Sequence, residues 1–197
     1  MDKIISKGLD LPISGSPKNE IIKPINQKII SISPKNFKSL KPKLTVNKGD
    51  LVKIGDVLFY DKGNTNVLIV SPVSGKIIDI EYGERRSINK IIIDNDNKYR
   101  YKDFDPVLLS DMNLLKHNDV SKILCERGLW PLIRQRPYDI IPSIEQRPKS
   151  IFVNFCISSP LAPSMELLCS DNDALRLGLE ALGKLSNNCV HIVFSNK

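Results

Sequence analysis

The sequence predicts a two-domain α+β/α/β protein, with an all-β domain at the N-terminus and an α/β segment at the C-terminus. Between residues 44 and 80, β-branched and apolar residues recur near every second position, broken by turn residues, which is typical of short strands. From Pro106 the apolar spacing changes to three- and four-residue steps, which is typical of helices. We therefore divide the chain into an all-β domain (1–105), a helical connector (106–148) and a truncated α/β segment (149–197).

Tight turns define the all-β domain. Gly49-Asp50 and Gly55-Asp56 place the same pair twice, six positions apart. Glycine adopts positive φ and aspartate bonds to its own backbone, so each pair can close a turn. Ser71–Gly75 repeats this pattern, because its proline presets φ and removes a ladder donor. We expect a compact sandwich of short bent strands, closed by a pairing strand over Tyr99–Asp105.

Two short helices are expected in the connector. The candidate N-caps are Ser110-Asp111 and Asn118-Asp119, since short polar side chains accept hydrogen bonds from the first turn. Gly128 is expected to act as the C-cap. His117 is expected at the polar edge of the second helix.

The C-terminal segment reads as strand, helix, strand. A buried strand over Ile151–Cys156, a helix over Asp173–Ser186 and a strand over Cys189–Phe194 predict a parallel pair with one crossover. This order resembles the start of a degenerate Rossmann-like domain. The turn at 157–163 holds two prolines and no Gly-x-Gly-x-x-Gly pattern, so direct NADH or flavin binding is not expected. The parallel pair should leave one sheet face uncovered and one edge open.

The charge is concentrated near the N-terminus. The net charge is +7, and residues 1–60 hold eleven lysines, no arginine and five acids, a difference of +6. A nucleic-acid site would need aromatic residues interleaved with arginine, so no nucleic-acid partner is expected. Dispersed lysines suit anionic lipid headgroups or an acidic partner protein, and the alternative is a solvated basic face. No apolar run approaches the roughly 20 residues that cross a bilayer, and the N-terminus lacks a signal-peptide core, so we expect a cytoplasmic protein.

The cysteines and histidines do not suggest a metal centre. Zinc and iron–sulfur sites need closely spaced ligand pairs, and no Cys-x-x-Cys pair occurs. We expect four reduced, buried or half-buried thiols, no Cys–His or Ser–His arrangement within reach, and therefore no independent enzyme. The cysteines are Cys125, Cys156, Cys169 and Cys189.

The turn pattern of the all-β domain resembles the biotinyl/lipoyl type of barrel-sandwich hybrid. In that family a hairpin presents the lysine that carries the cofactor. The resemblance implies that Lys62, within Asp61-Lys62-Gly63, is the attachment point of a carrier domain. The alternative is a lysine in a solvated turn, because Gly63–Asn66 follow it here where carrier hairpins usually show Met or Ala beside the lysine.

Five further motifs, in this order, resemble the N-terminal portion of the A subunit of the Na+-translocating NADH:quinone reductase, a bacterial respiratory complex. The resemblance covers essentially the whole chain. It implies a peripheral protein on the cytoplasmic face of the inner membrane, with other subunits of the complex as partners. It also implies that FMN, riboflavin, FAD and a 2Fe-2S centre belong to those partners and that no cofactor binds here directly, with ubiquinone as the one candidate ligand. The motifs are Lys7–Gly15, Gly83–Arg86, Gly128–Tyr138, Ile151–Asn154 and Ser159–Ala162.

The same resemblance implies which residues lie near quinone. Aromatic rings can stack on a quinone and guanidinium groups can donate to its carbonyls. The alternative is a cluster that bridges the two domains or contacts another protein of the complex. Because family members continue well past residue 197, we also expect this chain to be a fragment or a truncated product, and a non-catalytic interaction fragment is an alternative to a working subunit. The implied quinone-proximal residues are Phe37, Leu40, Trp130, Arg134, Arg136 and Tyr138.

Overall fold

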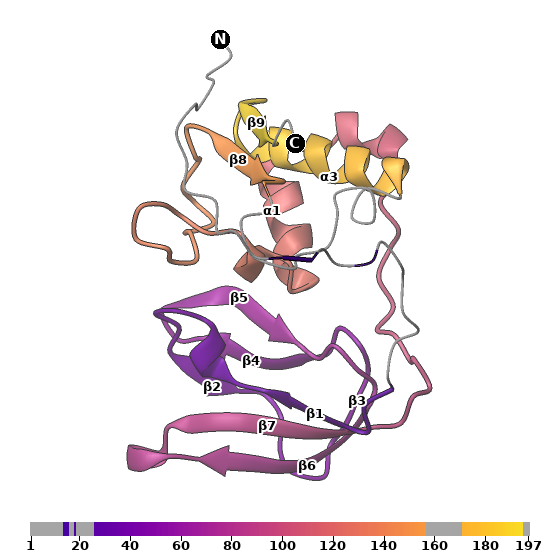
Figure 1. Cartoon of the computed structure of the whole chain (residues 1–197), viewed down its shortest axis with the longest axis vertical. Coiled ribbons are helices and arrows are strands. Elements are labelled where there is room, and N and C mark those ends of the chain that lie inside the picture. The colour runs from indigo at the N-terminus through magenta and orange to yellow at the C-terminus, as the bar shows by residue number, and fades with distance from the viewer. Residues whose placement is uncertain (1–13, 16–17, 19–25, 157–170, 195–197) are drawn as a thin grey trace.

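The computed structural model describes residues 14–15, 18, 26–156 and 171–194. Within them, seven antiparallel strands form two facing sheets. One sheet has the order β1-β7-β6-β3 and the other the order β2-β4-β5 (Figure 1). The strands are β1 (Ile29–Ile32), β2 (Pro42–Leu44), β3 (Leu51–Val52), β4 (Val57–Asp61), β5 (Asn64–Val70), β6 (Gly75–Tyr82) and β7 (Ile88–Asn95).

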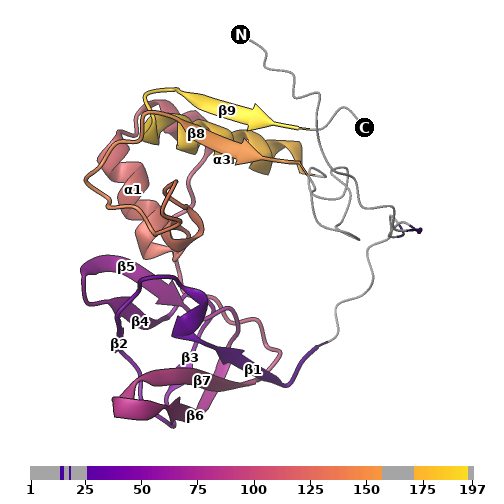
Figure 2. The same ribbon diagram turned by 60° about the vertical axis from the view of Figure 1, so that its left-hand side comes forward.

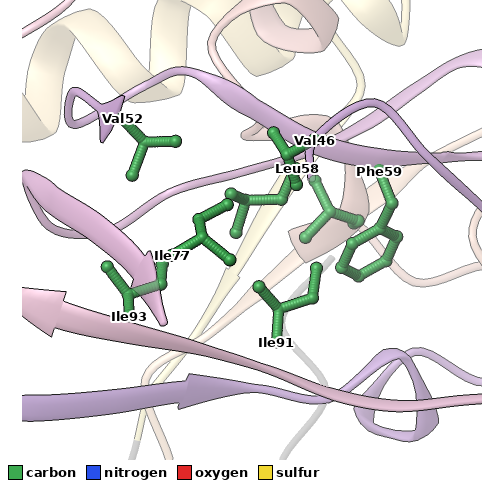
Figure 3. Close-up of a cluster of buried hydrophobic side chains, with 8 residues drawn as sticks. Val46, Val52, Leu58, Phe59, Ile77, Ile91 and Ile93 are labelled. Atoms are coloured by element: carbon green, nitrogen blue, oxygen red, sulfur yellow. The ribbon is translucent and has the colours of Figure 1, made fainter. Parts of the chain in front are cut away.

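The core of this barrel lies between the two sheets. Core side chains alternate along β6 and β7, as a period of two requires, whereas the register shift between Val57 and Phe59 of β4 buries two neighbouring side chains together. Leu58, Phe59, Ile77, Ile91 and Ile93 are fully buried, and Figure 3 shows them converging from both sheets. The expected sandwich of short strands is confirmed.

The region after β7 differs from the expectation. No strand forms over Tyr99–Asp105. Instead, Tyr101 makes a single parallel bridge with Ile54, held by Ile54 N–H donating to Arg100 O and Lys102 N–H donating to Ile54 O, each at 2.8 Å. Because Ile54 lies in the short turn between β3 and β4, the partner backbone offers only this one residue for pairing.

The connector folds into three short helices, one more than expected. They are the 3-10 helix η3 (Leu109–Asn113), the α-helix α1 (His117–Glu126) and the 3-10 helix η4 (Trp130–Leu132). The expected N-caps are one turn too late: Asp111 and Asp119 occupy the third helical position, where the Asp119 carboxylate accepts the Lys116 N–H at 2.8 Å. His117, the first residue of α1, is buried rather than at a polar edge, since this helix packs against both β5 and α3.

The C-terminal segment forms the expected parallel pair. Strand β8 (Ile151–Asn154) pairs with β9 (Val190–Val193), and α3 (Asn172–Leu185) packs on one face. Strand β8 was expected to be buried, and this expectation is wrong. Phe152 is 67% exposed on the sheet face that α3 leaves uncovered. The turn at 157–163 lies outside the described residues.

A second hydrophobic cluster joins the barrel to the helices. Val67 of β5 packs with Val120 and Cys125 of α1, with Trp130 and with Leu185 of α3. Figures 1 and 2 accordingly show α1 lying between α3 and the β5 side of the barrel.

Candidate functional site at the junction of barrel and connector

The segment Phe37–Leu40 leaves the 3-10 helix η1 (Pro34–Asn36) at one end of the barrel. Phe37 is half-buried, and its ring meets the Phe59 ring edge-on with 6.2 Å between centroids. Leu40 packs against both hydrophobic clusters. The barrel core therefore fixes this segment, and Leu40 carries it to the connector.

The segment Trp130–Tyr138 begins directly after a helix stop. Gly128 has φ +68°, and hydrogen bonds run from Gly128 N–H to Cys125 O and from Leu129 N–H to Leu124 O. This pair of bonds is the Schellman motif, which favours glycine at the left-handed position, so the predicted C-cap role of Gly128 is confirmed. The turn directs Trp130 inward, where it is 3% exposed and its Nε1–H donates to Pro142 O at 2.9 Å.

The other three predicted residues of this segment differ in exposure. The Tyr138 residue is 68% exposed. The Arg136 side chain is 78% exposed and lies 3.7 Å from the Asp139 carboxylate. Arg134 is half-buried, and its Nη1 is buried without a hydrogen-bond acceptor among the residues that the structure describes. A buried donor of this kind calls for a partner.

The two segments, about one hundred residues apart in sequence, meet at one place. Lys38 Nζ donates to Tyr138 O at 3.2 Å, and Leu40 packs against the cluster that contains Trp130. The sequence linked these segments only through a family resemblance, since no periodicity or spacing relates them.

Lys62 lies at the tip of the two-residue turn between β4 and β5 and is exposed. The turn is tied down, because the Asp61 carboxylate accepts the N–H groups of Lys41 and Gly63. The geometry thus presents Lys62 at a hairpin tip, as a carrier lysine would require. Whether this lysine is modified remains a prediction.

Sequence reasoning missed a basic basin of about 640 Å³ beside Phe37 and Leu40. Part of the signal was visible, since lysines recur at every third position from Lys35 to Lys41 and two arginines are adjacent in a hairpin. Nothing local predicts that these segments face each other. Ser33 brings them together, because its Oγ donates to Asn89 O at 2.6 Å. The basic residues lining the basin are Lys35, Lys38, Lys41, Lys62, Arg85 and Arg86.

The expectation that no cysteine and histidine lie within reach is wrong. Cys189 Sγ is 3.5 Å from His191 Nε2 and 3.1 Å from Ser150 Oγ. The physical reason is the period of a strand, which places residues i and i+2 on the same face. His191 also stacks on Phe152, with 4.9 Å between ring centroids.

The described residues hold neither a metal-ligand cluster nor a membrane-spanning helix. No group of three or more potential metal ligands occurs there. In the same part of the chain, no helix has the length and apolar character needed to cross a bilayer.

Fold and site together define a class of protein, namely a barrel-sandwich hybrid domain followed by an α/β domain, with its candidate site where the two meet. Two family models match the chain: the NqrA N-terminal barrel-sandwich hybrid domain over residues 4–96 and the NqrA second alpha/beta domain over residues 115–197. The chain belongs to the NqrA family, the A subunits of the Na+-translocating NADH-quinone reductase.

Curated relatives agree with the family models. Each of three bears the name of the A subunit of a Na+-translocating NADH-quinone reductase. The relative from Photorhabdus laumondii is 33% identical over 97% of this chain, that from Rhodopirellula baltica 32% over 98%, and that from Marinomonas sp. 35% over 95%. The chain spans only 42–43% of the length of these relatives.

Proposed function

We propose that this chain acts as the peripheral NqrA component of the complex on the cytoplasmic face of the bacterial inner membrane, where it supports quinone reduction coupled to sodium export. The names of its relatives support this assignment. In this proposal, FMN, riboflavin, FAD and the 2Fe-2S centre belong to partner subunits. The chain contributes a surface and binds none of these groups itself.

Within this function, the surface that faces quinone consists of Phe37–Leu40 and the exposed part of Trp130–Tyr138. The observation that supports the proposal is the meeting of these two segments, where Lys38 Nζ donates to Tyr138 O at 3.2 Å. The Arg134 guanidinium is half-buried and its Nη1 has no acceptor among the described residues, so a small change of its side-chain rotamer would let it donate to a quinone carbonyl. The Tyr138 ring is largely exposed and can cover a planar ring. Trp130 positions the segment from within the core.

An interface between subunits is the alternative role for the same surface. A carboxylate from a partner protein would satisfy Arg134 equally well, and Arg136 is exposed enough to pair across an interface. The two roles differ in what is lost when the arginines are removed: quinone binding in one, complex assembly in the other.

Affinity purification of the tagged chain from host membranes tests membership of the complex. Co-purification of flavin-bearing subunits with NADH:quinone activity is expected. A chain recovered without any membrane-embedded partner would contradict the proposed role.

Arg134→Ala separates the two roles of the surface. In the assembled complex, we expect this change to weaken binding of a quinone analogue by about tenfold or more, since a hydrogen bond from a charged group is worth roughly 1.5–3 kcal/mol. Arg136→Ala should weaken binding less, and Arg176→Ala, an exposed arginine paired with Glu180 on α3, serves as control. A variant that fails to assemble, with analogue binding unchanged in whatever complex still forms, would favour the interface.

A carrier role for Lys62 is a second candidate, supported by its exposed place at a hairpin tip. The intact mass of the chain purified from its native host tests it. An added lipoyl or biotinyl mass that disappears in Lys62→Arg would establish a carrier, and an unmodified mass would exclude one.

A further inference from the structure

The basic basin shares the segment Phe37–Leu40 with the proposed quinone surface, but neither Arg85 nor Arg86 has a role in that function. Its walls come from three separate stretches, residues 34–42, Lys62 and residues 85–88. All six of its cationic side chains belong to exposed residues, and no acidic residue lines it. A concave surface with charges of one sign concentrates the electric field and attracts the opposite charge.

These cations lack acidic partners within the described part of the chain. The ion pairs found there involve other residues, such as Lys48 with Asp79 and Lys90 with Glu81. Of the six, only Lys38 makes a side-chain hydrogen bond among the described residues, and its acceptor is a backbone carbonyl. The basin therefore collects positive charge that the fold itself does not neutralise.

The backbone of one wall is strained. Arg85 and Arg86 form the tip of the β6–β7 hairpin with φ of 54° and 56°, and Ser87 N–H closes the turn on Glu84 O at 3.1 Å. Turns of this hand favour Asn-Gly, because side chains with a Cβ resist positive φ. Ser39, in the opposite wall, also has positive φ. Strain kept in the lining of a pocket is a pointer to function.

The floor of the basin is apolar and fixed. Phe37, Leu40 and Ile88 line it and pack against the barrel core. Exposed cationic side chains thus surround an apolar floor that packs against the core, so binding an anion would require ordering the side chains alone.

From these observations we propose that the basin binds a phosphate-bearing anion, with Arg85 and Arg86 as its main ligands. Guanidinium groups donate two parallel hydrogen bonds to phosphate oxygens, and lysines add point charges around them. A diphosphate or a phospholipid headgroup shares this chemistry. The volume of about 640 Å³ falls within the roughly 300–1,000 Å³ of small-ligand pockets.

The decisive variant replaces Arg85 by Asn and Arg86 by Gly in the full chain. Because Asn-Gly suits this turn, the variant should fold at least as well, and its Tm should rise by about 2–4 °C. Its affinity for the anion should fall by about tenfold or more. The control, Lys53→Ala with Lys76→Ala, removes two exposed positive charges outside the basin, and its affinity should change by less than about twofold.

Two probes distinguish the sources of phosphate. Inorganic pyrophosphate is titrated by calorimetry, and vesicles of phosphatidylcholine with or without phosphatidylglycerol are tested by co-sedimentation. If the hairpin variant loses pyrophosphate binding but keeps its sedimentation with phosphatidylglycerol vesicles, the ligand is a soluble phosphorylated molecule. If the variant loses only the phosphatidylglycerol-dependent sedimentation, the ligand is a lipid headgroup. Absence of binding in both arms, or equal loss in variant and control, would overturn the proposal.

Discussion

Among single residues, Asp96 carries the clearest electrostatic role in the barrel. Ser74 Oγ donates to its carboxylate at 2.6 Å, the Lys98 N–H donates at 2.9 Å, and Arg100 Nη2 lies at 2.5 Å. These groups, the Ser74 hydrogen bond first, lower the pKa of Asp96 to about 2. The ionised carboxylate thus ties the start of β6 to the chain that leaves β7.

Asp96→Asn should change how stability depends on pH. The folded-state pKa of Asp96 lies below its usual value of 3.8, so its contribution is complete above about pH 4 and is lost as the pH falls through about 2. We expect the variant to unfold at a lower Tm at pH 7, with the difference from wild type shrinking towards pH 2. Thermal unfolding followed by circular dichroism measures both.

Asp103→Asn is the matched control for this change. Asp103 is exposed and accepts no hydrogen bond among the described residues. Its replacement should leave the pH profile of Tm unchanged. An equal effect of the two variants would show that the loss of any negative charge, and not the Ser74–Asp96–Arg100 arrangement, sets how Tm falls at acidic pH.

The thiols should differ in reactivity. Burial, aided by the negative charge of Glu126, raises the pKa of Cys125 to about 11, whereas Cys156 and Cys189 are partly exposed. Because the thiolate is the reactive form, iodoacetamide at pH 8 should alkylate Cys125 much more slowly than the other two. Peptide mass spectrometry over time measures the rates, and equal rates would contradict the buried environment of Cys125.

At the scale of elements, the β6–β7 hairpin depends on one glycine. Gly75 opposes Asn95 in this ladder, and an added Cβ would lie 2.0 Å from Asp94 O, with no flexible side chain able to move away. The sheet accepts only glycine here because two backbones approach closely.

Gly75→Ala should therefore destabilise the barrel by roughly 1–3 kcal/mol, since the two strands must separate. Gly178→Ala on α3 is the opposite case, because nothing lies within 4 Å of the added Cβ and alanine favours a helix by roughly 0.5–1 kcal/mol. The urea midpoint should fall for the first and rise for the second. A midpoint for Gly75→Ala equal to wild type would contradict the clash.

Sequence patterns predicted elements better than the contacts between them. Period-two runs located the barrel strands, and Gly128 marked the helix end, because both depend on local chemistry. Helix starts were placed too late, since Asp119 at the third helical position satisfies the Lys116 N–H as effectively as an N-cap would. Tyr99–Asp105 had strand-like composition but no free partner edge beyond Ile54.

For the whole molecule, the candidate site was the least predictable part from residues alone. The meeting of Lys38 with Tyr138 and the basin between residues 34–42 and 85–88 depend on tertiary packing across long sequence separations. The family resemblance named residues on both segments, yet local patterns gave no reason for their proximity. Sequence did show the basic bias that the basin concentrates.

Strand β5 links the two halves of the described chain more closely than their separate folds suggest. It supplies Ile69 to the barrel core and Val67 to the helical core, and Leu40 packs against both. Neither core can lose its packing without exposing apolar surface of the other. The two regions should therefore unfold as one cooperative unit. A destabilising mutation in a helix should then lower the unfolding temperature of the barrel as well.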